Sequence, residues 1–283
     1  MGGGLSGCLD AWRCGLLLAL CLLTRAACAF EHDHAAWSGL LRAHVQWNAA
    51  GTATTVDYAG LARDRVALGR YLASLSALPL AEFDSWNRAQ QRAFLINAYN
   101  AWTVELILGA EPGLASIREL GSLFSSPWKK RFFQLFGQPE SLDGIEHERL
   151  RGAADYADPR IHFAVNCASV GCPALRPEAY RGDDLDAQLE DQTRRFLRDR
   201  TRNRWDRAEG TLYLSRIFDW YAEDFVLEFR GGRSLGEFLA QHADELGMTA
   251  DEAAALAAGE LEIDFLDYDW SLNAAKAAAG AQQ

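Results

Sequence analysis

The spacing of hydrophobic residues predicts that the chain is built mainly from amphipathic helices. Along much of its length, apolar side chains recur every three or four residues, as they do on one face of a helix. Capping residues, glycine and proline mark where several of these segments begin and end. The expected helices are Trp37–Asn48, Tyr58–Ala77, Ser85–Leu108, Ile145–Arg151 and Leu185–Arg198, with two more after the caps Ser234 and Thr249.

Shorter segments between these helices are expected to be strands, because they are apolar or alternating and are bounded by turn residues. They are Arg131–Phe136, Arg160–Val165, a hairpin of Trp205–Arg207 with Thr211–Ile217, and Leu261–Leu266. Because the strands are scattered among helices, we predict an α+β fold. The expected form is a helix-rich single domain with a small, mostly antiparallel sheet, for which a papain- or transglutaminase-like arrangement is considered.

Composition narrows the classes of protein to which the chain can belong. Of its 283 residues, 49% are hydrophobic and 24% are charged, which excludes a disordered chain and a membrane protein with several spans. The formal net charge of −11 argues against nucleic-acid binding, which requires a basic surface. No repeat or linker divides the chain, so an N-terminal helical segment (30–84) and a main α+β domain (85–283) are expected to pack as one unit.

The first 29 residues have the pattern of a secretory signal peptide. Arg13 precedes an apolar run over residues 14–24 that is too short to span a bilayer, and Ala27-Cys28-Ala29 has the pattern of a cleavage site. We therefore expect cleavage after Ala29, a periplasmic or secreted protein, and no transmembrane span after cleavage. The scarcity of lysine relative to arginine is typical of a GC-rich bacterial genome.

Two of the six cysteines lie in the segment that is richest in reactive side chains. The other four belong to the predicted signal peptide: Cys8, Cys14, Cys21 and Cys28. Cys167 and Cys172 remain, close to His162 and Ser169, where a predicted strand runs into a turn. Functional sites are often built on such loops.

These two sulfurs have several interpretations. As a nucleophile, Cys167 would need an imidazole base, which His162 or His147 could provide. In an oxidising compartment, two cysteines separated by four residues are more often a disulfide, here Cys167–Cys172. A strained and exposed disulfide could also have a redox role. A zinc site that includes the same histidines lacks a CxxC pair, so we predict no metal and no cofactor.

Two asparagines interrupt an apolar helix face. Asn97 and Asn100 fall on the stripe that also carries Val104 and Ile107. Buried amides need hydrogen-bond partners, and the structural interpretation is that these two hold the backbone of a neighbouring loop. The functional interpretation is that one of them orients a catalytic imidazole, as an asparagine does in papain-like sites.

His147 lies in a second polar motif. Asp143 and Glu146 have the spacing of a helix cap and its capping-box partner, which places His147 inside a short helix. There it could be a base, a ligand or a surface residue.

Aromatic and polar residues elsewhere are candidates for substrate binding: Tyr99, Ser169 and Trp270. Trp270 belongs to a C-terminal aromatic segment, residues 268–273, which we expect to pack back onto the domain and which could form the wall of a pocket. The basic run over residues 128–133 could dock an anionic substrate or a membrane surface, although a solvated loop edge is the simpler interpretation.

Five motifs along the chain are similar to those of a known family. They are FLINAYNAWTV (94–104), SLDGIEHERLR (141–151), DPRIHFAVNCASVGCPAL (158–175), IFDWYAEDF (217–225) and YDWSLN (268–273). With them the chain resembles the domain-of-unknown-function family 547. The resemblance implies a secreted bacterial member with one compact domain, and it provides no substrate or mechanism. The motif positions that it marks are Asn97, Asn100, His147, His162, Cys167 and Cys172.

Two functions are therefore predicted as alternatives. The first is a thiol-dependent hydrolase or acyl transferase that acts on peptide or amide bonds in the cell envelope. Cys167 would be its nucleophile, His162 or His147 its base, and Asn97 or Asn100 its orienting amide. The second is a non-catalytic periplasmic binding or scaffold module with a structural disulfide. The expected partner is an unidentified envelope substrate or protein.

Overall fold

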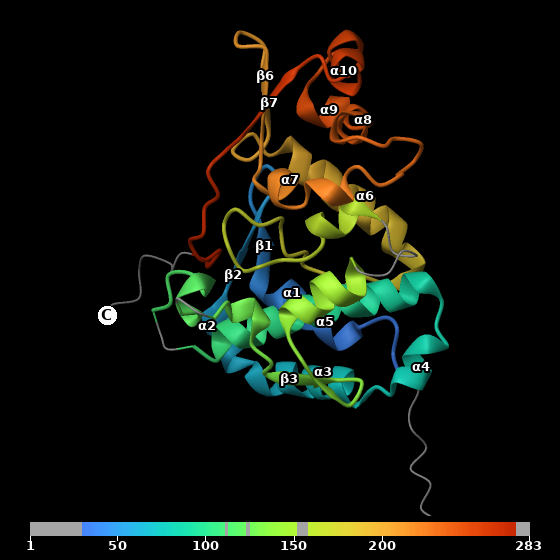
Figure 1. The fold of residues 1–283 in the computed structure, drawn as a ribbon. Helices are drawn as coiled ribbons and strands as arrows, with labels where there is room; N and C mark the ends of the chain where they lie inside the picture. The colour runs from blue at the N-terminus through green and yellow to red at the C-terminus, as the bar shows by residue number, and fades with distance from the viewer. Residues whose placement is uncertain (1–29, 111–112, 123–124, 152–157, 276–283) are drawn as a thin grey trace, which may run out of the picture.

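The computed structural model describes residues 30–275, except 111–112, 123–124 and 152–157. These residues form the helix-rich α+β fold that the sequence predicted (Figure 1). The predicted signal peptide, residues 1–29, lies outside the described residues. Within the described part of the chain, no helix is long and apolar enough to cross a membrane.

Most of the secondary structure is helical, and the longest helix, α5, runs through the larger part of the molecule (Figure 1). The α-helices are α1 (Ala35–His44), α2 (Tyr58–Arg63), α3 (Arg65–Ala77), α4 (Leu80–Asp84), α5 (Arg88–Leu108), α6 (Leu185–Arg198), α7 (Ile217–Trp220), α8 (Leu235–Ala240), α9 (Ala243–Leu246) and α10 (Ala250–Ala257). The other helical turns are η1 (Ile117–Leu120), η2 (Pro127–Lys129), the π-helix η3 (Gly144–Leu150), η5 (Pro159–Phe163), η6 (Gly182–Asp184) and η7 (Ala222–Asp224).

The strands in the described residues are short and form three separate sheets. Two of the sheets are antiparallel pairs, and the third is a three-stranded sheet in which β6 is antiparallel to β5 and parallel to β7. The strands are β1 (Val45–Trp47), β2 (Thr54–Val56), β3 (Phe133–Leu135), β4 (Gln138–Glu140), β5 (Arg204–Asp206), β6 (Thr211–Leu214) and β7 (Glu262–Phe265). One small, mostly antiparallel sheet was expected, but the strands are divided among three sheets in different places in the fold.

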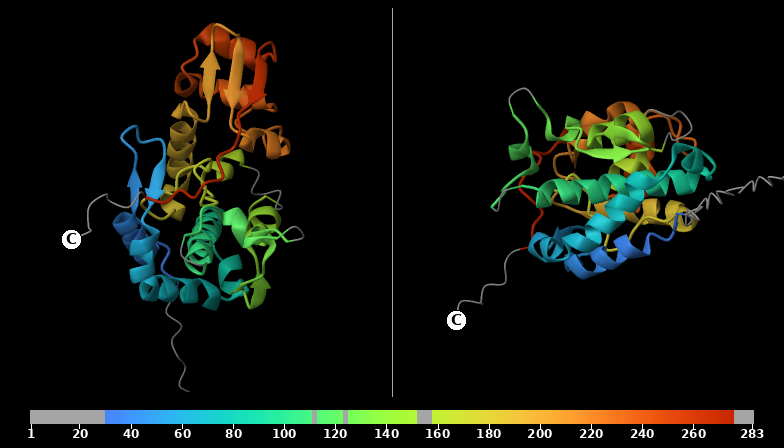
Figure 2. Two further views of the ribbon diagram at one scale, coloured as in Figure 1. Left: turned by 90° about the vertical axis from the view of Figure 1, so that its left-hand side faces the viewer. Right: turned by 90° about the horizontal axis from the view of Figure 1, so that it is seen from below.

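Two clusters of buried hydrophobic side chains form the core. The larger surrounds α5 and includes Trp37 and Leu68 from the N-terminal helices. The smaller lies between α6 and the three-stranded sheet, which stands at the end of the molecule away from α5 (Figure 2). The turn η5 joins them, because Ile161 packs in the larger cluster and Phe163 in the smaller.

The strand predicted over Arg160–Val165 is wrong, because this segment contains the 3₁₀ turn η5. Pro159 has a backbone suited to the first turn of a helix, and the Asp158 carboxylate accepts a 3.0 Å hydrogen bond from the Arg160 backbone N–H. The apolar residues suggested a buried strand. These residues are apolar because they are buried in two different hydrophobic clusters, Ile161 in the larger and Phe163 in the smaller.

Several other predicted element ends also differ from the structure. The helix predicted over Trp37–Asn48 ends at His44, since the following backbone is extended and pairs as β1 with β2. The helix predicted from Ser85 begins after Asn87, whose Oδ1 accepts from the Gln90 backbone N–H at 3.0 Å in a capping box. The helix α6 has the predicted bounds. The helix predicted over Tyr58–Ala77 is interrupted at Asp64, which separates α2 from α3, and the predicted segments that became η3, β3, β5, β6 and β7 differ from the structure at one or both ends.

Asn97 and Asn100 on α5 hold backbone, as the structural interpretation predicted. Asn97 is fully buried, its Nδ2 donates to the Tyr180 carbonyl at 2.7 Å, and its Oδ1 accepts from the Tyr180 N–H at 2.9 Å. Asn100 donates to the Ala164 carbonyl at 2.9 Å and accepts from the Asn166 N–H at 2.8 Å. Both amides therefore connect α5 to loops whose backbone is not held by the hydrogen bonds of a helix or sheet.

The C-terminal segment after β7 packs back onto the domain, as expected from the sequence (Figures 1 and 2). Its backbone N–H groups at Leu272, Asn273 and Ala275 donate to the carbonyls of Ala115, Ala168 and Val56, at 2.7, 3.0 and 2.8 Å respectively. These bonds fix the aromatic residues Tyr268 and Trp270 beside the loop that carries the cysteines.

We predict that Asn97→Ala destabilises the fold by about 2–4 kcal/mol, because it leaves the buried N–H and C=O of Tyr180 without partners. Chemical denaturation measures this change. The control is Asn87→Ala, which removes only a helix cap at an exposed position and should cost about 1 kcal/mol. Equal losses in the two variants would contradict the role given to Asn97.

Candidate functional site

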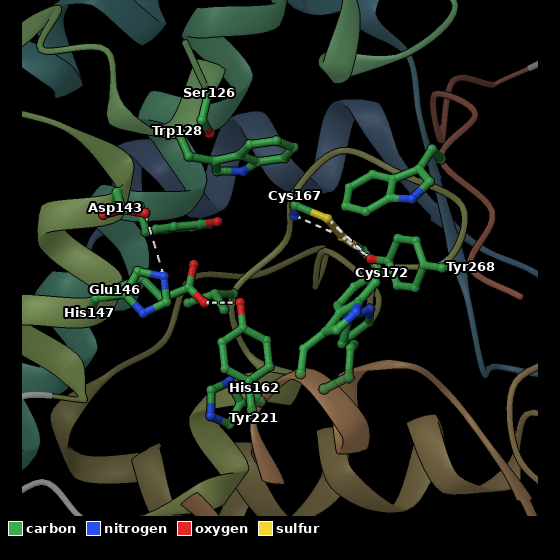
Figure 3. A pocket seen from close by; sticks show the side chains of 16 residues that line it. Ser126, Trp128, Asp143, Glu146, His147, His162, Cys167, Cys172, Tyr221 and Tyr268 are labelled. Atoms are coloured by element: carbon green, nitrogen blue, oxygen red, sulfur yellow. Dashed lines mark hydrogen bonds and ion pairs between the residues drawn. A yellow bond between two sulfur atoms is a disulfide. The ribbon is translucent and has the colours of Figure 1, made fainter. Parts of the chain in front are cut away.

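A cavity of about 210 Å³ opens where η2, η3, the cysteine loop, α7 and the C-terminal segment meet (Figure 3). Its walls combine aromatic rings with carboxylates, imidazoles and the two sulfurs. The aromatic residues are Tyr99, Trp128, Trp220, Tyr221, Tyr268 and Trp270. The ionisable residues are Asp143, Glu146, His147 and His162. The cavity is therefore the candidate functional site.

One wall of the cavity contains the Cys167–Cys172 disulfide, whose Cα atoms are 6.1 Å apart. The Tyr268 hydroxyl lies 3.2 Å from Cys167 Sγ and 3.1 Å from Cys172 Sγ. Gly171 permits this approach, because a Cβ at that position would lie 3.0 Å from the Tyr268 ring. The structure thus contains the disulfide that was one of the interpretations of this cysteine pair.

Asn166 holds the loop that carries the disulfide. Its Nδ2 donates to the Pro173 carbonyl at 2.7 Å, its Oδ1 accepts from the Ala168 N–H at 3.0 Å, and its own N–H donates to Asn100. Ala168 has a φ of 62°, a left-handed conformation that is uncommon for a residue with a Cβ. The bonds from Asn166 compensate for this backbone strain.

Glu146 is a buried carboxylate on the wall opposite the disulfide, and its side chain points into the cavity (Figure 3). It is 6% exposed, and its Oε1 accepts a 2.7 Å hydrogen bond from the Tyr221 hydroxyl. Burial, reinforced by this carboxylate, raises the pKa of both Tyr99 and Tyr221, so both hydroxyls stay protonated. Among the described residues, no cationic side chain forms an ion pair with Glu146.

Arg151 determines the protonation of His147. Arg151 Nη1 lies 2.6 Å from His147 Nδ1, and a guanidinium can only donate. Nδ1 is therefore an acceptor, and the ring proton is on Nε2, which faces Asp143 Oδ1 at 3.5 Å. In this arrangement His147 is a neutral imidazole.

His162 is oriented by a carboxylate. Its Nε2 lies 2.6 Å from Asp224 Oδ2, and its ring stacks on Tyr221 with 4.1 Å between centroids. Burial opposes ionisation of Asp224, but hydrogen bonds from His162 and Arg151 outweigh it and lower the pKa of Asp224 to about 2. Arg151 Nε also lies 2.5 Å from the same Asp224 oxygen, so one carboxylate joins both groups.

The structure brings most of the predicted site residues together. Those that line the cavity are Tyr99, His147, His162, Cys167, Cys172 and Trp270. Asn97, Asn100 and Ser169 do not line it: the two asparagines hold backbone, and Ser169 is 1% exposed beneath the C-terminal segment. The imidazoles bond to carboxylates and Arg151, so neither asparagine orients them as the functional interpretation expected.

Sequence reasoning missed several residues of the site. Glu146 was assigned to a capping box, but the helix start is capped by Ser141, whose Oγ accepts from the Gly144 N–H at 3.0 Å. Tyr221 and Asp224 lie in a motif that carried the family resemblance, although their spacing gave no sign of contact with His162. In the residues that the structure covers, no group of three or more His, Cys, Asp or Glu could hold a metal ion.

Comparison with known proteins finds one family model that matches part of the chain. Residues 83–197 match the model of the family described as "Protein of unknown function, DUF547", which confirms the resemblance seen in the sequence motifs. No curated protein and no solved structure matches the chain. The matched segment includes the disulfide but ends before Trp220, Tyr221, Tyr268 and Trp270, so the cavity extends beyond it.

We predict that Asp224→Asn lowers the free energy of unfolding by about 2 kcal/mol at pH 7, and that this loss disappears as the pH falls from about 4 to about 2. The ionised carboxylate stabilises the fold above its ordinary pKa, and protonation removes this contribution as the pH drops through the lowered value. Urea denaturation across this pH range measures the difference between variant and wild type.

Asp219→Asn is the matched control, because Asp219 lies five residues away and pairs with Arg216 at the surface. Its effect should be small at every pH. A loss in Asp224→Asn that is as large at pH 2 as at pH 7 would contradict the ion-pair assignment.

Proposed function

We propose that this domain is a non-catalytic binding module that takes a small ligand into the aromatic cavity, and that the Cys167–Cys172 disulfide pins the wall of that cavity. One observation carries the proposal. Cys167 Sγ, which a thiol enzyme would use as its nucleophile, is bonded to Cys172 Sγ. The aromatic rings and carboxylates, in contrast, are held in fixed positions around the cavity. Fixed rings with a few convergent polar groups are typical of ligand sites.

The disulfide acts on the cavity through Tyr268. The Tyr268 hydroxyl touches both sulfurs, and its ring is within 4.8 Å of Trp220 and 4.6 Å of Trp270, measured between centroids. A change in the loop is therefore transmitted to three aromatic rings of the cavity. This coupling supports a structural role for the sulfur pair.

A thiol-dependent hydrolase or acyl transferase acting on envelope peptide or amide bonds is the second candidate. The observation in its favour is that Cys167, His147 and His162 line the same cavity. It requires a reduced form of the protein, because only a free thiolate on Cys167 can attack a carbonyl carbon.

The two cysteine variants separate these functions. In the binding module, Cys167→Ala and Cys172→Ala are equivalent, and each should lower Tm by about 5 °C, because a disulfide that closes a loop this short contributes about 2 kcal/mol. In a thiol enzyme, Cys167→Ala alone abolishes turnover. Thermal unfolding of both variants is the measurement.

Labelling of the native, unreduced protein with iodoacetamide provides the independent check. We expect no alkylation at either cysteine and an intact mass lower than that of the reduced protein by two hydrogens. Alkylation of Cys167, or a Cys167→Ala variant with unchanged Tm and lost function, would reject the binding module in favour of the enzyme.

We propose also that the protein is exported and cleaved after Ala29, which places it in the periplasm or outside the cell. The signal-like sequence supports this proposal, and so do the contacts that Phe30 makes with the rest of the domain. The Phe30 backbone N lies 3.2 Å from Glu82 Oε1, and its ring packs on Trp86 and Phe94 at 5.3 Å. Cleavage would turn this N–H into an ammonium group beside a carboxylate.

We predict that Glu82→Gln destabilises the processed chain by about 0.5–1 kcal/mol more than it destabilises an uncleaved chain, because only the processed chain has the ammonium partner. Mass spectrometry of exported protein should show Phe30 as the first residue. Glu31→Gln, an exposed neighbour, is the control. A different first residue, or equal effects in both chains, would contradict the assignment.

A further inference from the structure

In the part of the chain that the structure describes, no cationic side chain forms an ion pair with the Glu146 carboxylate. Buried carboxylates are normally paired with a cation, because removing a charge from water is costly. Glu146 is 6% exposed, and the groups that hydrogen-bond to its carboxylate are the neutral hydroxyls of Tyr221 and Tyr99. A carboxylate in this position attracts a positive charge from outside the protein.

The nearby basic side chains are already engaged. Arg151 bonds to Asp224 and lies 2.7 Å from Glu223, and Arg149 lies 2.9 Å from Glu140. His147 is neutral, because its Nδ1 accepts from Arg151. The second carboxylate of the cavity, Asp143, faces only this neutral imidazole in the described residues. The polar wall of the cavity is therefore negative.

The aromatic wall is a continuous cluster of rings. Trp220, Tyr268 and Trp270 lie within 4.6–5.6 Å of each other, and Trp128 lies 5.8 Å from Trp270, measured between centroids. The faces of such rings attract cations, and groups of them recognise alkylated ammonium ions. This cluster shows the preference directly, since the guanidinium carbon of Arg118 lies 5.2 Å from the Trp270 ring centroid.

The volume of the cavity and its access from solvent limit the size of the ligand that it can bind. A cavity of about 210 Å³ is smaller than the roughly 300–1,000 Å³ typical of sites for drug-sized molecules, so it suits a small ion or the head of a longer molecule. Trp220 is 46% exposed, which leaves its ring open to an approaching ligand. The net charge of −11 favours the approach of cations.

We propose that this cavity binds a small organic cation of the alkylammonium class, with the charged head between Glu146 and the rings of Trp128, Trp220 and Tyr268. The inference rests on the proposed binding function and specifies its ligand class. An anionic ligand is disfavoured, because the basic run contributes only Trp128 to the cavity, while Lys129 and Lys130 do not line it.

The test is a titration of the full-length protein with choline, followed by isothermal calorimetry and by tryptophan fluorescence. The neutral analogue of choline, in which carbon replaces the ammonium nitrogen, has the same shape and no charge. We expect saturable binding of choline and at least about tenfold weaker binding of the neutral analogue, since only the cation interacts with the carboxylate and the ring faces.

Two variants and two matched controls locate the site. Glu146→Gln should weaken choline binding at least about tenfold, and Trp220→Ala about threefold to tenfold. Glu245→Gln removes an equally buried carboxylate outside the cavity, and Trp47→Ala removes a partly exposed ring on β1. Both controls should bind choline like the wild type, and thermal unfolding confirms that all four variants are folded.

Three results would overturn the inference: no saturable choline binding, equal binding of the neutral analogue, or unchanged binding in folded Glu146→Gln. None of these changes the outcome of the cysteine labelling, so the binding module can stand while its ligand class is rejected. Binding of benzoate that is lost in Trp220→Ala would show that the same cavity takes an anion. Alkylation of Cys167 would instead reject the binding module itself.

Discussion

The hydrogen bond between Asn100 on α5 and the backbone N–H of Asn166 determines the position of the whole site. It is 2.8 Å long, it is buried, and it joins the most regular element of the fold to a loop without a ladder of its own. From Asn166, two further bonds close the loop that carries the disulfide. An unpaired polar group at this depth would cost about 1–3 kcal/mol, so the loop has one favourable arrangement against α5. The sulfurs, and through them the Tyr268 ring, take their places from that arrangement.

The cavity exists because segments far apart in the chain converge on this loop. The turn η5 lies between the two hydrophobic clusters, so neither cluster can shift without moving His162 and the loop that follows it. The C-terminal segment returns from the three-stranded sheet and is held by backbone bonds to Ala168 and Val56. The polar wall is ordered differently. There Arg151 and Asp224 fix both imidazoles by charge-assisted hydrogen bonds. The aromatic wall is thus positioned by backbone, and the polar wall by side chains.

The sequence predicted the features that depend on local pattern. The fold class, the bounds of α6, the capping box at Thr249 and the return of the C-terminal segment follow from periodicity, caps and clustered apolar residues. It did not predict η5, because Ile161 and Phe163 enter different cores and so imitate a buried strand. Asp224 was missed for a related reason. It contacts His162 from 62 residues away, and single-sequence spacing does not reveal such a contact. Asn97 and Asn100 illustrate the reverse case, since burial on an apolar face correctly implied that both amides have partners.

Glu146 connects the physical chemistry of the fold to its proposed function. A protein that needed only stability at this position would be better served by an apolar side chain, since a buried carboxylate without a cation is costly. Here the carboxylate accepts a hydrogen bond from the Tyr221 hydroxyl on one side and faces the cavity on the other. The rings across that space are held together by the disulfide and Tyr268 rather than packed into the carboxylate. A cation bound in the cavity, as proposed, would offset this cost, so Glu146 is the residue on which the proposed ligand class depends most.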